Sequence, residues 1–140
     1  MSAQSTATGQ STSLISPPSN SVGYVVILAA VITSVIHLLL GPQVMGFSQL
    51  LGVLFILNGL GFFGGTILYL TNYWRRELYL VATGYAVATI IGLFAFQGFS
   101  IEAFYMNGSL NPMAVVSKAA EAVIAFGAVY LYTDTGMSNN

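Results

Sequence analysis

Four long apolar segments, separated by short polar stretches, dominate the pattern of this chain. They lie at about 22–40, 45–70, 78–99 and 113–132. Each is close to the ~20 residues that a helix needs to cross ~30 Å of hydrocarbon. Gly41-Pro42, the polar stretch 72–77 and Asn111-Pro112 mark the breaks, and the last pair is typical of a helix start. The pattern predicts an all-α integral membrane four-helix bundle, in which short loops make sequential helices antiparallel neighbours.

The two ends of the chain have a different character from the apolar segments. Residues 1–21 are rich in Ser, Thr and Gln and carry no charge, so we expect a disordered polar tail. Residues 133–140 are expected to form a short polar C-terminal tail. The N-terminal stretch has no basic region of the kind that a secretory signal needs, which predicts that the first span is retained.

Composition favours the membrane class and argues against several functions. Charged residues make up 5% of the chain and apolar residues 56%, whereas soluble domains carry roughly 25% charged residues. With a net charge of −1 and no basic run, nucleic-acid binding has no electrostatic basis. The sequence has no cysteine and no HExxH or GxSxG motif. We therefore expect a protein that is not an enzyme, with no catalytic residues, no metal ligands and no cofactor.

Two arginines determine the predicted orientation. Arg75 and Arg76 are the basic residues that lie outside the spans, so the positive-inside rule places the loop between spans two and three in the cytoplasm. The protein is then expected in the cell membrane, with both termini in the cytoplasm. Aromatic residues agree, because an interfacial belt forms at that end from Tyr24, Tyr69, Tyr73, Trp74, Tyr79, Tyr130 and Tyr132.

This topology brings polar residues that are distant in sequence to one depth. His37 lies about 6 Å of helix rise from the outer end of span one, and Lys118 and Glu121 lie about 9 and 13 Å from that of span four. Gln97 closes the outer end of span three, and Asn58 lies near the midplane of span two. Ionisable groups within a membrane usually face the bundle interior and pair. The sequence therefore predicts a polar cluster in the outer leaflet.

The cluster admits several interpretations. Lys118 and Glu121 are three residues apart and can form a structural ion pair, which favours a non-enzymatic structural or accessory protein. A proton-linked or ion-linked site made of Glu121, Lys118 and His37 is the main alternative. A pocket for a small apolar molecule or lipid head group, or contact with a partner subunit, is also open. A redox subunit that binds haem or copper is a further alternative, although the chain offers a single histidine. Expected partners are the lipid bilayer and a homo-oligomer or larger membrane complex.

Four stretches of the sequence carry a resemblance to a known group. They are Val35-Ile36-His37-Leu38-Leu39-Leu40-Gly41, the run 51–59, Arg75-Arg76, and Ser117-Lys118-Ala119-Ala120-Glu121. Together they resemble uncharacterised four-span membrane proteins common in haloarchaea, with more distant-looking relatives in actinobacteria, which have no established activity. The resemblance implies a histidine late in span one and a lysine-bearing or acidic start to span four. The long segment 100–111 departs from it.

Overall fold

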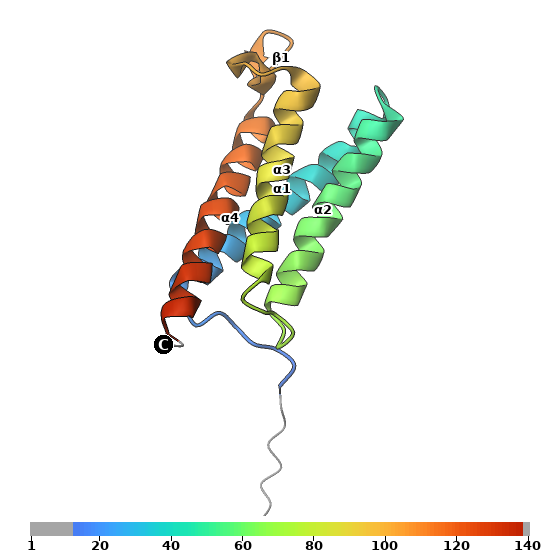
Figure 1. Ribbon diagram of the computed structural model, residues 1–140. Coiled ribbons are helices and arrows are strands. Elements are labelled where there is room, and N and C mark those ends of the chain that lie inside the picture. The colour runs from blue at the N-terminus through green and yellow to red at the C-terminus, as the bar shows by residue number, and fades with distance from the viewer. Residues whose placement is uncertain (1–12, 139–140) are drawn as a thin grey trace, which may run out of the picture.

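Four long helices make up most of the described chain, which covers residues 13–138 of a computed structural model (Figure 1). They are α1 (Ser21–Met45), α2 (Gln49–Tyr69), α3 (Leu78–Gln97) and α4 (Pro112–Met137). All four are long and apolar enough to cross a membrane. The predicted all-α class, with four helices packed against one another, is confirmed.

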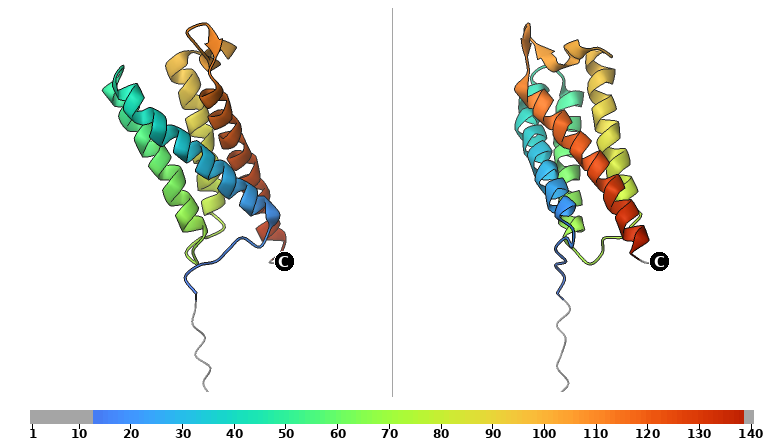
Figure 2. Two further views of the ribbon diagram at one scale, coloured as in Figure 1. Left: turned by 180° about the vertical axis from the view of Figure 1, so that it is seen from behind. Right: turned by 90° about the vertical axis from the view of Figure 1, so that its left-hand side faces the viewer.

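The helices do not all pack against their neighbours in sequence. Helix α1 packs along both α2 and α4, and α3 packs along α4, whereas α2 and α3 make little direct contact. In Figure 2, left, α1 crosses the bundle obliquely. It starts beside the C-terminal end of α4 and ends beside α2. The expectation that sequential helices are neighbours therefore fails for α2 and α3, although a short turn joins them.

Glycines allow α1 and α2 to approach closely. A Cβ added at Gly52 would lie 2.8 Å from the carbonyl oxygen of Gly41, and one at Gly59 would lie 3.0 Å from that of Ser34. The Ser34 Oγ also donates a hydrogen bond of 2.7 Å to the Gly59 carbonyl oxygen. Small residues that let backbones meet are typical of helix contacts in membranes.

The prediction that α1 ends at Gly41-Pro42 was wrong. The helix continues through Pro42 to Met45, and residues 46–48 form the turn before Ser48 caps α2. Proline removes one hydrogen bond of the helix, and near the last turn that loss is small. The close packing of Gly41 on Gly52 gives a reason for the last turn to remain helical, because it holds this part of α1 against α2.

The connection between α3 and α4 contains a small cap on the bundle. A 3-10 helix at Ile101–Phe104 precedes the two-residue strands β1 (Tyr105–Met106) and β2 (Ser109–Leu110), which pair antiparallel. Positive φ angles at Asn107 and Gly108 form the turn of this hairpin. As predicted, Asn111 caps α4, since its Oδ1 accepts a hydrogen bond of 3.1 Å from the Met113 N–H.

Both ends of the chain contain more structure than predicted. Helix α4 extends to Met137, so residues 133–137 are helical and do not form a tail. The Ser16 N–H donates to the Leu70 carbonyl oxygen (2.8 Å), and Ile15 forms an isolated bridge with Thr71. Residues 13–20 are therefore ordered against the α2–α3 turn. The disorder predicted from composition is therefore wrong for residues 13–20, which these backbone hydrogen bonds help to hold in place. Residues 1–12 of the predicted tail lie outside the described residues.

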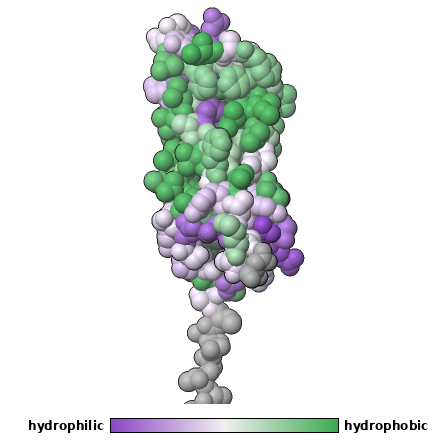
Figure 3. All heavy atoms as spheres, turned by 60° about the vertical axis from the view of Figure 1, so that its left-hand side comes forward, coloured by the Kyte–Doolittle hydropathy of each residue, from purple (hydrophilic) through white to green (hydrophobic). Residues whose placement is uncertain are grey.

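Polar side chains lie inside the bundle together with mostly small apolar ones, while large apolar side chains cover its outside. Glu121, Thr33 and Ser34 are the largest fully buried side chains among the described residues. Leu, Val, Ile and Phe are exposed along every helix, and Phe126 on α4 is 79% exposed. Figure 3 shows hydrophobic residues around the middle of one face and hydrophilic residues gathered mainly at the end near the N-terminal segment.

Candidate functional site

The carboxylate of Glu121 lies at the centre of the polar cluster and is fully buried. Its Oε1 accepts hydrogen bonds from Thr33 Oγ1 of α1 (3.0 Å) and from Ser117 Oγ, one turn earlier on α4 (3.2 Å). The two hydroxyls are themselves 3.1 Å apart. A buried charge is costly unless it is paired and hydrogen-bonded, and these contacts meet both needs together with Lys118.

Lys118 provides the countercharge. Its Nζ donates to Glu121 Oε2 at 2.6 Å and to the Thr89 carbonyl oxygen of α3 at 3.3 Å. An ammonium has three N–H groups, so one remains after these two contacts within the described chain. The Lys118 side chain is 11% exposed, whereas that of Glu121 is completely covered. Lys118 therefore joins α4 to the backbone of α3. Because its side chain is slightly exposed, its remaining N–H lies at the edge of the buried cluster.

His37 approaches the same carboxylate from α1 and is also buried. Its Nδ1 lies 2.9 Å from the Thr33 carbonyl oxygen, which can only accept, so Nδ1 carries a proton in this contact. Its Nε2 lies 3.7 Å from Glu121 Oε1. At that distance there is no direct hydrogen bond, but an imidazolium would form an ion pair with the carboxylate. The ring packs on Phe55 at a centroid distance of 5.1 Å.

A cavity of about 580 Å³ borders this cluster, at the end of the bundle that carries β1 and β2; we call it the hairpin-side cavity. Its walls are mainly apolar and come from all four helices. The polar side chains that line it are those of His37, Asn58, Tyr85, Thr89, Gln97, Asn111, Ser117 and Lys118. Glu121 is not among the lining residues, so Ser117, Lys118 and His37 separate the carboxylate from the cavity.

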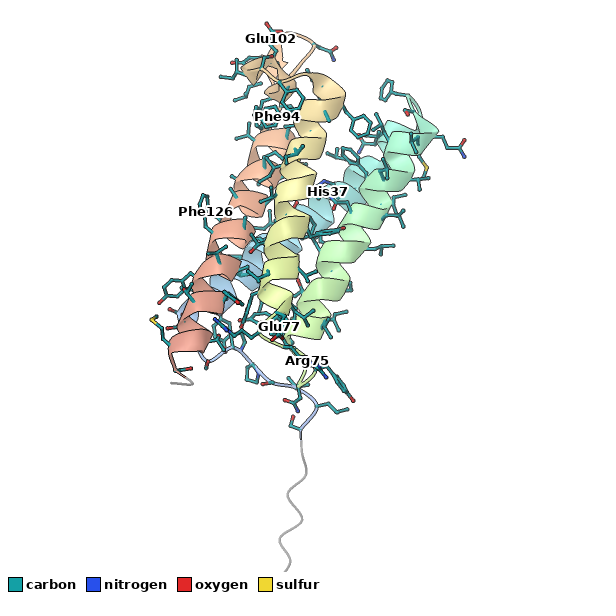
Figure 4. The ribbon with its side chains drawn as sticks, in the orientation of Figure 1. His37, Arg75, Glu77, Phe94, Glu102 and Phe126 are labelled. Atoms are coloured by element: carbon teal, nitrogen blue, oxygen red, sulfur yellow. The ribbon has the colours of Figure 1, made fainter. Side chains whose placement is uncertain are left out.

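The five predicted cluster residues thus fall into two groups. His37, Lys118 and Glu121 meet, and Figure 4 shows His37 within the bundle, between its two ends. Asn58 and Gln97 line the cavity but have no side-chain hydrogen bond among the described residues. Sequence reasoning missed the role of the Thr33 and Ser117 hydroxyls. Their positions, four residues before His37 and Glu121, are the signal that could have identified them.

The two arginines that determined the predicted orientation lie at the opposite end from the hairpin. Figure 4 places Arg75 and Glu77 at one end of the bundle and Glu102 at the other. The Arg76 Nε donates to the Tyr132 carbonyl oxygen at 3.0 Å, and its guanidinium lies 3.9 Å from the centroid of the Tyr132 ring. Arg76 therefore ties the α2–α3 turn to the last turns of α4, where a positive charge also suits the helix dipole.

The cluster differs from a multi-residue metal centre. Among residues 13–138, three or more His, Cys, Asp or Glu side chains do not gather at one place. His37 and Glu121 approach each other closely, and the remaining partners are hydroxyls, an ammonium and carbonyl oxygens. This set is suited to holding a charge, sharing a proton or donating hydrogen bonds to a bound molecule.

Replacing Lys118 and Glu121 separately and together measures their coupling. We expect Lys118→Met and Glu121→Leu each to lower the free energy of unfolding by about 3–5 kcal/mol, because each leaves a buried charge unpaired. The double variant should lose far less than the sum. Unfolding of the purified protein in mixed detergent micelles gives the three values, with Glu102→Gln as an exposed control. Additive losses would show that the two side chains are not coupled.

Comparisons with other proteins yield a family and no relative of known activity. Neither the curated proteins nor the solved structures contain a match to this chain. Residues 8–132 match the model of DUF7475, a family of unknown function, and the chain therefore belongs to that family.

Proposed function

We propose that this chain is a multi-pass integral membrane protein that binds a neutral amphipathic molecule in the hairpin-side cavity. It acts without catalysis, as a binding or accessory protein. The observation that carries the proposal is the cavity itself, since about 580 Å³ is within the range of ordinary ligand sites.

Membrane insertion is supported by the apolar outer surface of the bundle. The exposed faces carry Leu, Val, Ile and Phe, while the largest fully buried side chains among the described residues are polar. In water the exposed side chains would form an apolar surface far larger than that of a typical soluble monomer. In a bilayer they face the lipid, and the interior groups pair with one another.

The polar groups of the cavity indicate the chemical class of its ligand. Glu121 balances the charge of Lys118, so the cluster has no net charge while His37 is neutral. Lys118 then offers one N–H, which needs an acceptor on the bound molecule. A hydroxyl oxygen accepts a hydrogen bond from this N–H, and an aliphatic chain suits the apolar walls. The ligand expected from these contacts is a long-chain alcohol or a molecule with similar polarity.

The proton-linked alternative also has a specific observation in its favour. Because Nδ1 of His37 donates to the Thr33 carbonyl oxygen, a neutral ring presents the lone pair of Nε2 toward the Glu121 carboxylate, 3.7 Å away. Two acceptors that face each other favour capture of a proton or of a water molecule between them. The hairpin-side cavity, which His37 lines, offers one route to this pair.

Filling the cavity tests the binding proposal. A Cβ at Gly92, which lines the cavity, meets no atom within 4 Å, and the same holds at Gly84, which does not line it. We expect Gly92→Phe to weaken decan-1-ol binding at least tenfold and Gly84→Phe to leave it unchanged, because only the first fills the site. Calorimetry on the purified protein measures both. Equal binding by the two variants, or no saturable binding by the wild type, would reject the proposal.

The proton-linked alternative predicts a flux that depends on Glu121. In liposomes with a trapped pH indicator, an imposed pH gradient should decay faster with the wild type than with Glu121→Gln, because the amide cannot take up a proton. Glu102→Gln, the same change on the exposed loop, is the matched control. Identical decay for all three proteins would exclude this alternative and leave the binding proposal intact.

Orientation is tested at the two ends of the bundle. The chain contains no cysteine, so Glu77→Cys and Glu102→Cys each introduce a single thiol at opposite ends. With both termini cytoplasmic, a membrane-impermeant maleimide should label Glu102→Cys in intact cells and Glu77→Cys only after lysis. The reverse pattern would invert the proposed topology without affecting the ligand proposal.

A further inference from the structure

A second cavity of about 200 Å³ lies in the other half of the bundle, next to the α2–α3 turn; we call it the turn-side cavity. Tyr85 lines both cavities and lies between them. Its hydroxyl donates to the Asn58 carbonyl oxygen at 3.3 Å, and its ring meets Phe62 edge to face at 4.9 Å. The side chain thus spans from α3 to α2 at the boundary between the two cavities.

The lining of the turn-side cavity differs in chemistry from that of the hairpin-side cavity. It includes no charged side chain and no imidazole. An aromatic group borders it, in which Trp74 packs edge to face on Tyr69 (4.9 Å) and on Tyr79 (5.3 Å). The remaining lining is mostly aliphatic, with Phe62, Tyr85 and Thr66 as the exceptions apart from glycine. Such a site excludes ions and favours a neutral, mainly apolar molecule.

One polar group at this cavity lacks a partner. The indole Nε1 of Trp74 is buried and has no hydrogen-bond partner within the described part of the chain. An indole N–H can only donate, and leaving a buried donor unpaired is costly. The tyrosine hydroxyls beside it are 3.5 Å apart and contact each other. A ligand in this cavity that carries an accepting oxygen would remove the cost at Trp74.

We propose that the turn-side cavity is a second binding site, for a neutral aliphatic molecule with a carbonyl oxygen that accepts a hydrogen bond from Trp74 Nε1. The site is independent of the ligand proposed for the hairpin-side cavity. Its volume suits a molecule with a short aliphatic chain. That molecule is either a free ketone or ester, or part of a membrane lipid whose carbonyl lies at the level of Trp74. Both sources present the same group to the indole.

Trp74 also reports on its own site, because it is the single tryptophan of the chain. We expect octan-2-one to produce a saturable change in tryptophan emission of the purified protein. Gly65 lines this cavity and Gly64 does not, and a Cβ at either position meets no atom within 4 Å. Gly65→Leu should abolish the change and Gly64→Leu should retain it. Gly92→Phe should also retain it, which separates this site from the hairpin-side cavity.

Trp74→Phe tests the hydrogen bond while preserving an aromatic ring. Calorimetry should show that the variant binds octan-2-one about fivefold more weakly than the wild type, the value of an ordinary hydrogen bond, with octane binding unchanged. Native mass spectrometry of protein extracted with its membrane identifies the source. A lipid retained by the wild type and lost in Gly65→Leu indicates a lipid, and binding of the added ketone alone indicates a free molecule. Equal ketone affinity of wild type and Trp74→Phe, or of Gly64→Leu and Gly65→Leu, would overturn the proposal.

Discussion

The buried carboxylate of Glu121 is the constraint on which the arrangement of this bundle depends. It must be neutralised and hydrogen-bonded, and its partners come from α1, through Thr33, and from α4, through Ser117 and Lys118. Lys118 extends the network to the backbone of α3 at Thr89. Three helices are thereby fixed around one charge. Helix α2 lies outside this network and is held against α1 by glycine contacts and by the Ser34–Gly59 hydrogen bond.

This division explains where the cavities occur. Helix α2 packs on α1, and α3 packs on α4. Neither arrangement brings α2 and α3 together, although they are consecutive in sequence. Residues of both α2 and α3 line each cavity. Small side chains contribute to the space, since a Cβ at Gly65 or Gly92 would meet no neighbouring atom. The positions of the two cavities therefore depend on which helices the polar network connects.

Much of the fold could be predicted from sequence, because it depends on local signals. Apolar length predicted the four helices, and Asn111-Pro112 predicted the start of α4. Depth along the helices predicted that His37 would approach Glu121, but it could not show that Asn58 and Gln97 would line a cavity without joining the network. Pro42 was misleading because tertiary packing, which periodicity does not encode, gives α1 a reason to continue. Membrane orientation and the resemblance to haloarchaeal proteins stay predictions.

The separation of the two cavities rests on a small residue and a large one that face each other. Tyr85 crosses from α3 to α2, and a Cβ added at Gly61 of α2 would overlap its hydroxyl group. Gly61 therefore leaves the room that lets Tyr85 reach the Asn58 carbonyl oxygen and pack on Phe62. Tyr85 thus bridges α2 and α3, which make little direct contact, and it borders both cavities. The same tyrosine therefore lines both of the proposed binding sites.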